Sequence, residues 1–238
     1  MILIRCLAFL CALAVLSGAG VALAQNNIGQ TAEAHNEVSS EMSGAAAHIS
    51  SGDPVLRNEA VRTGVDSTAK FVFLDSTNLA LGPTSRVVLD KFVYEGAASG
   101  EAVAIKLTKG LFRFTTGVLD KKDYKITTTT AAIGVRGTVL DIDVRPNDTD
   151  VTLIEGEAIV CPLAGGPCVR LKSEGQTARV LKKAGTTTAS FVPTPVNFAS
   201  LCAGGGALCA SSSYASVATG QREALGPSGG GGATLCGR

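Results

Sequence analysis

The sequence contains no tryptophan, and aromatic residues make up only 5% of its 238 positions. Proteins that bind single-stranded nucleic acid stack bases on aromatic side chains and meet the phosphates with a basic face. The formal net charge is +1, and loss of Arg5 with the N-terminal leader described below leaves 1 − 1 = 0. We therefore expect no nucleic-acid partner.

Residues that commonly carry catalysis are also scarce. The chain has two histidines, His35 and His48. The Gly-x-Ser-x-Gly pattern occurs at residues 226–230, within the Gly-rich tail, where we expect no strand-to-helix turn that would expose the serine as a nucleophile. No run of acidic residues follows the pattern of a calcium-binding loop. We therefore expect a protein that is not an enzyme, with no catalytic residue, no metal and no cofactor.

The first 24 residues have the pattern of a cleaved export signal. One cation, Arg5, precedes an apolar and small-residue run over residues 6–24, which ends in Ala-Leu-Ala. Signal peptidases cleave after such small residues, so we expect the mature chain to begin at Gln25. An uncleaved anchor is the alternative, since the run approaches the length of a membrane span. Cleavage predicts an exported protein, periplasmic or secreted, without a stable membrane anchor.

Five of the seven cysteines lie beyond that leader. Cys161 and Cys168 flank a Pro- and Gly-rich turn, and Cys202 and Cys209 flank a Gly-rich one at the same spacing. In an oxidising compartment each pair predicts a local disulfide. A four-cysteine zinc site is the alternative, but its ligands usually stand only two to four residues apart. Cys236 remains, either free or paired with a second molecule in a dimer.

The mature chain reads as short β-branched and aromatic runs, separated by Gly, Pro, Asp, Asn and Ser. Residues 52–183 show no sustained helical period, so we predict an all-β domain there. The turn spacing fits a roll or solenoid-like architecture and a sandwich equally well. Residues 25–51 are a polar N-terminal segment, and residues 184–238 are an extended tail rich in Gly, Ser and Ala.

Residues 123–144 form the centre of this pattern. Two strand-like runs, 124–128 and 138–144, flank a segment in which Gly134 and Gly137 predict a bulge or sharp bend. Asp141 and Asp143 stand two apart, so they share one face of the second run, which we expect to be solvated. Arg136 sits on the bend, where it would suit an anionic partner. These three residues are the candidate contacts.

Several of these motifs, in this order, resemble the FecR domain, the periplasmic part of the iron-citrate type transmembrane signalling regulators of Gram-negative bacteria. They are NEAVRTG (58–64), LALGPTS (79–85), LDKFVY (89–94), GLFRF (110–114) and IGVRGT (133–138). The resemblance covers residues 52–180 and implies an all-β module that signals through protein contacts and supplies no catalytic residues. Regulators of that type also carry a cytoplasmic anti-sigma segment and a membrane helix, so we expect a stand-alone exported version of the module here.

Three functions remain open at this point. The first is a non-enzymatic exported β-domain that binds another envelope protein or a cell-wall polymer in envelope signalling, through open strand edges and the turn at residues 95–100. The second is a structural envelope protein cross-linked through Cys236. The third is a polysaccharide-acting enzyme that uses Asp141 and Asp143 as acid and base.

Overall fold

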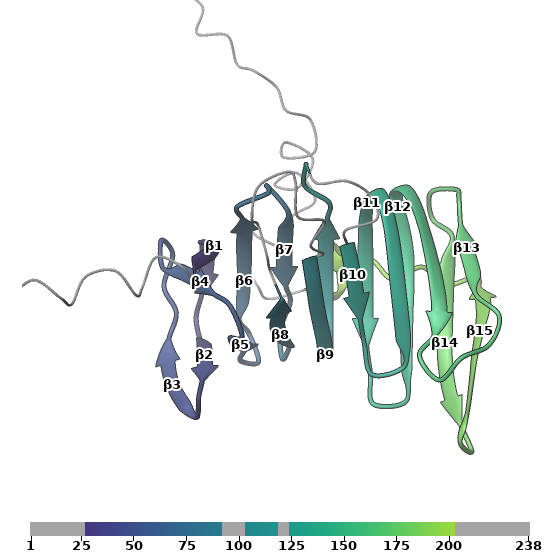
Figure 1. Ribbon diagram of the computed structural model, residues 1–238, viewed down its shortest axis with the longest axis horizontal. Helices are drawn as coiled ribbons and strands as arrows, with labels where there is room; N and C mark the ends of the chain where they lie inside the picture. The colour runs from purple at the N-terminus through teal and green to yellow at the C-terminus, as the bar shows by residue number, and fades with distance from the viewer. Residues whose placement is uncertain (1–26, 92–102, 119–123, 203–238) are drawn as a thin grey trace, which may run out of the picture.

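The computed structural model describes residues 27–91, 103–118 and 124–202, and it confirms the all-β prediction (Figure 1). The described residues contain one helix, α1 (Phe198–Leu201), and fifteen strands: β1 (Asn27–His35), β2 (Val38–Met42), β3 (Ala45–His48), β4 (Pro54–Leu56), β5 (Ala60–Thr63), β6 (Thr68–Phe73), β7 (Asn78–Leu81), β8 (Arg86–Lys91), β9 (Val103–Thr115), β10 (Tyr124–Thr127), β11 (Ala131–Val144), β12 (Asp148–Pro162), β13 (Val169–Leu171), β14 (Thr177–Lys183) and β15 (Thr186–Val192).

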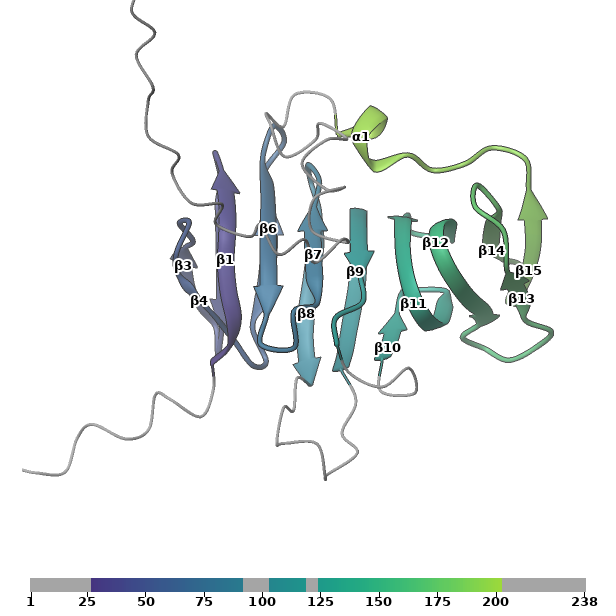
Figure 2. The ribbon, with the colours of Figure 1, turned by 90° about the horizontal axis from the view of Figure 1, so that it is seen from above.

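Hydrogen bonds join all fifteen strands into one sheet, which folds back on itself in two layers. We call the layers A and B. Layer A has the order β4-β1-β6-β7, then the C-terminal parts of β9 and β11, the N-terminal part of β12, and finally β14-β15. Layer B has the order β3-β2-β5-β8, then the N-terminal parts of β9 and β11 with β10 between them, the C-terminal part of β12, and β13. Figures 1 and 2 show the strands side by side along the long axis of the molecule.

The three long strands β9, β11 and β12 belong to both layers because each bends at a glycine. Gly110, Gly137 and Gly156 have φ angles of 105°, 58° and 84°, a backbone region that other residues rarely adopt. The bend expected beside Gly137 is thus confirmed, and the pairing register of β11 with β12 shifts there. Continuity through three strands makes the fold a flattened roll, which the sequence did not distinguish from a sandwich.

One hydrophobic core fills the space between the layers. Alternate residues of the central strands point inward, so that Ile133 and Val135 of layer B and Leu140 and Ile142 of layer A are all 5% exposed or less. All four belong to a single cluster of buried residues drawn from both layers. Along residues 138–144 the core side chains are those of Leu140, Ile142 and Val144, two positions apart.

The sheet extends beyond the limits expected for the domain. Residues 27–51 are part of it, because β1 pairs with β6 and β2 pairs with β5. At the other end, β15 pairs with β14 along its whole length, within what the sequence presented as the tail. Beyond β15 the chain runs back over layer A to α1 (Figure 2). We call residues 193–202 the strap.

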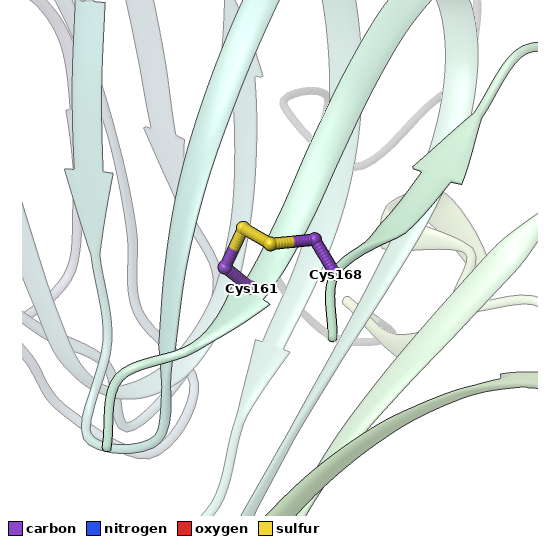
Figure 3. Close-up of a disulfide and its surroundings, with 2 residues drawn as sticks. All are labelled: Cys161 and Cys168. Carbon is purple, nitrogen blue, oxygen red and sulfur yellow. A yellow bond between two sulfur atoms is a disulfide. The ribbon is translucent and has the colours of Figure 1, made fainter. Parts of the chain in front are cut away.

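The predicted disulfide between Cys161 and Cys168 is confirmed, with an S–S distance of 2.05 Å. It links the end of β12 to the chain just before β13 (Figure 3). Cys202, on the strap, is buried and also disulfide-bonded. Its expected partner Cys209, the remaining Cys236 and the leader all lie outside the described residues.

Candidate functional site

Arg136 lies at the corner where β11 passes from layer B to layer A. Gly137 follows it, and Gly156 faces the corner from β12. A Cβ atom on Gly156 would stand 1.9 Å from the carbonyl oxygen of Gly137, so no larger residue fits there. The two glycines thus allow both strands to turn at one place, and the turn fixes the backbone that carries Arg136.

Thr138 ties this corner together with its side chain. Its Oγ1 accepts a hydrogen bond from the backbone N–H of Arg136 at 2.8 Å and donates one to the carbonyl of Glu157 at 2.9 Å. The N–H of Thr138 donates in turn to Oγ1 of Thr116, on the chain that leaves β9. Each residue of the segment Arg136-Gly137-Thr138 therefore has a defined place, and Arg136 carries the side chain of this segment that is exposed to solvent.

A hollow of about 310 Å³ lies beside Arg136 on the outer face of layer B. Its walls come from β10, β11, β12 and β13 and the residue after β13, and they include Arg136, Arg170 and Lys172 together with Glu157. Its size is near the lower limit of known ligand pockets. Strand pairing brings a further cation close to this wall, because Gly134 and Ile159 stand between Lys125 and Arg170 in one row across the strands.

The outer face of layer B carries more cations than this hollow alone. Among the described residues five exposed cations point outward there and form no ion pair within 4 Å: Lys106, Lys125, Arg136, Arg170 and Lys172. We call these five residues the basic face. Glu157 lies directly across the strands from Arg136 and supplies one opposing charge. Sequence patterns indicated only Arg136, because the other four come from separate strands that pairing brings together.

The outer face of layer A is built in the opposite way. Asp141, expected on a solvated face, has no exposed surface. Nε and Nη2 of Arg113 donate to its two carboxylate oxygens at 2.6 and 2.8 Å. The backbone N–H of Phe198 donates to the same carboxylate at 2.8 Å. The expectation of a solvated carboxylate was therefore wrong for Asp141, which is fully hydrogen-bonded beneath the strap.

The strap completes this burial. Phe198 is fully buried in a small cluster with Ala80, Leu111, Val196 and Cys202. The guanidinium carbon of Arg113 lies 5.5 Å from the centre of its ring, a distance suited to a cation–π contact. The backbone N–H of Val196 donates to Oγ1 of Thr152 at 2.7 Å, which holds the strap over β12. The strap is therefore an integral part of the fold.

Asp143 belongs to a second ionic cluster at the end of β11. Arg145 donates to Asp143 and, at 2.7–2.9 Å, to Asp148 and Asp150, while Arg179 donates twice to Asp150 at 2.6 Å. Arg145 is thus the cation that neutralises Asp143.

Protonation in this cluster follows burial and pairing. Burial raises the pKa of Asp143, and its contacts with Arg145 offset only part of that shift. Burial also acts to raise the pKa of Asp150, but hydrogen bonds from Arg179 and Arg145 outweigh it and leave this pKa below its usual value. The hydrogen bond to Asp148 is the main reason that the pKa of Arg145 is raised. Asp143, Asp148 and Asp150 thus share Arg145 as a hydrogen-bond donor, and Asp150 also accepts from Arg179.

The remaining candidates for chemistry lie apart from Asp141 and Asp143. His35 is on β1, with Nε2 3.8 Å from the carboxylate of Glu33, and His48 is exposed on β3. Within residues 27–91, 103–118 and 124–202, no three metal-ligating side chains cluster as a metal site would require. Nor does that part of the chain contain a helix with the length and hydropathy of a membrane span.

Comparison with known proteins agrees with the motifs. Residues 59–158 match the sequence model of the family described as FecR protein. Two crystal structures of a candidate anti-sigma factor from Parabacteroides distasonis ATCC 8503, at 1.65 and 2.50 Å, align with a TM-score of 0.44 and 12% identity. Each alignment covers 56% of this chain and 59% of that protein, so less than two thirds of its length is spanned. No curated protein matches.

Proposed function

We propose that residues 59–158, which match the FecR family, form a FecR domain and that the chain is a non-enzymatic binding module of the bacterial envelope. It takes part in signalling by holding an acidic segment of another envelope protein against the basic face. The periplasmic or secreted location expected from the leader places the module where such partners are found.

The observation that carries this proposal is a set of five exposed cations that form no ion pair with another described residue. A surface arginine or lysine often forms an ion pair with a neighbouring carboxylate, as Arg62 and Arg86 do with Glu41 on the same layer. The basic face instead leaves five cations available beside a hollow. An extended acidic peptide meets such a row with charge complementarity, which speeds association and selects the partner.

Rigidity supports the same reading. Arg136 is held at a corner that two glycines and Thr138 define, so little conformational freedom of the backbone is lost when a partner binds. Arginine also offers a planar fork of donors that matches a carboxylate, which suits Arg136 and Arg170 to acidic side chains. The corner thus presents a preformed contact point.

A charge-reversal experiment tests the proposal. Fluorescence anisotropy with a labelled oligoglutamate peptide measures binding to the mature protein, and cross-linking in living cells with mass spectrometry identifies what it captures. We expect the double variant Arg136→Glu/Arg170→Glu to lose at least about tenfold in affinity and to lose the captured protein, since each reversal turns an attraction into a repulsion.

The matched control is Lys182→Glu/Lys183→Glu, which makes the same change in net charge at the exposed tip of β14. This control should keep its affinity for the peptide and its captured partner. Equal losses in both double variants would show that only net charge matters and would refute a site at the basic face. Capture of wall polymer without any protein would also refute it.

A further inference from the structure

The edge of layer A at β15 differs from the other strand edges of the sheet. β15 pairs over seven consecutive residues with β14 and with no other described strand. Its sequence, TTTASFV, contains no charge and no proline. Natural proteins protect sheet edges with charges, prolines, bulges or very short strands. By those criteria β15 is unprotected.

The other edges in the described residues show these protections. β4, at the far edge of layer A, has three residues and begins with Pro54. β13 also has three residues and includes Arg170. β3 has four residues. β15 is therefore the longest edge that the described sheet exposes.

The turn between β14 and β15 determines which backbone groups face outward. Ala184 and Gly185 have φ angles of 49° and 81°, so this is a two-residue turn of type I′, closed by the pair Lys183 and Thr186. In such hairpins every second pair is hydrogen-bonded, starting from the closing pair. The N–H and C=O groups of Thr187, Ala189 and Phe191 consequently point away from β14.

Side chains at the same three positions point toward the core side of layer A. Ala189 packs against the edge of the core, whereas Phe191 is 57% exposed. An exposed phenylalanine therefore lies next to three N–H groups and three C=O groups that pair with no other described residue, which is the pattern that strand addition would cover. Both observations locate the contact at one edge.

We propose that β15 pairs antiparallel with β15 of a second copy of this chain, centred on Ala189. This register places Ala189 opposite its own symmetry mate and Thr187 opposite Phe191. All three outward-facing residues then exchange both backbone hydrogen bonds. Because the strand is uncharged, no like charges meet across the two-fold axis, and each Phe191 is partly covered by the other copy.

A proline at the centre of β15 tests the contact between copies without removing a hydrogen bond inside the monomer. Ala189→Pro removes one outward N–H but none that bonds to β14, so we expect a folded protein that is monomeric in size-exclusion chromatography with light scattering. The wild-type mature chain should be dimeric at the same high micromolar concentration. Carrying both in a Cys236→Ser background removes the competing dimer through that cysteine.

Ala46→Pro in β3 is the matched control. β3 follows a turn of the same type, with Ser43 and Gly44 at φ angles of 52° and 83°, and Ala46 likewise points its N–H outward. This variant should remain dimeric. A monomeric Cys236→Ser protein at all concentrations, or dimers that persist in Ala189→Pro, would overturn the proposal.

A cysteine placed at the two-fold axis tests the register. Hydrogen-bonded antiparallel partners have Cα atoms about 5.5 Å apart, which a disulfide bridges. Ala189→Cys, again with Cys236→Ser, should give a covalent dimer on mild oxidation in non-reducing gels, and Ala46→Cys should not. Equal cross-linking in the two variants would show random collision and would reject this interface.

Discussion

The outer faces of layers A and B use charge in opposite ways. On layer A, Arg113 and Asp141 neutralise each other beneath the strap, and Arg145 joins three carboxylates at the strand ends. On layer B, the five cations of the basic face are exposed and form no ion pair with any residue in the described part of the chain. Both faces have alternating polar residues in the sequence, so alternation alone does not separate a buried face from an available one.

The difference teaches where charge contributes to folding and where it is free for binding. Removal of one partner from a buried ion pair strongly destabilises the fold, because the other charge stays buried without compensation. An exposed cation costs little to replace. Substitutions should therefore change stability on layer A and binding on layer B.

The largest expected effect is at Asp141. Asp141→Ala leaves Arg113 and the N–H of Phe198 without their shared acceptor, and we expect a loss of about 3–5 kcal/mol in the free energy of unfolding. Urea-induced unfolding of the mature chain measures it. Glu157→Ala, on the outer face of layer B, is the control and should lose less than about 0.5 kcal/mol. Equal losses would remove the distinction between the faces.

A smaller effect is expected at the strap. Phe198→Ala removes a fully buried ring, and we expect a loss of about 2 kcal/mol. Hydrogen exchange should become faster at the amide of Val196, which the docked strap holds against Thr152. Leu201→Ala changes an exposed residue of the same helix, at 56% exposure, and should leave that exchange unchanged. Unchanged exchange in Phe198→Ala would mean that its ring does not hold the strap.

The smallest expected effect is the pH dependence of the stability that Asp150 contributes. The pKa of Asp150 is lowered in the folded state, so its contribution to stability is present above the usual carboxyl pKa, near pH 4, and is lost as pH falls through the folded value. Asp150→Asn should therefore destabilise the protein by about 1 kcal/mol at pH 7 and by less at pH 3. Unfolding titrations at both values measure this difference. A difference in stability between Asp150→Asn and the wild type that stays the same at both pH values would contradict this prediction. The pKa of Asp143 is raised, so the pH dependence of its contribution to stability should have the opposite sign.

The sequence predicted those features that depend on neighbouring residues. The strand class, the bend at Gly137, the inward residues of β11 and the disulfide between Cys161 and Cys168 all follow from local pattern. The solvated face expected at Asp141 was wrong because its partners lie 28 and 57 residues away, at Arg113 and Phe198. The basic face was missed, apart from Arg136, for the same reason. These contacts depend on which strands pair with one another, and no local sequence pattern specifies that pairing.

The three strands that bend at glycine corners also affect how the molecule withstands disruption. Because β9, β11 and β12 each supply hydrogen bonds to both layers, neither layer can be peeled away or slide past the other while these strands stay intact. A mechanical force applied to any one of these three strands therefore acts on the hydrogen bonds of both layers. The roll should therefore yield as a single mechanical unit, and a partner held at its surface pulls against the whole domain.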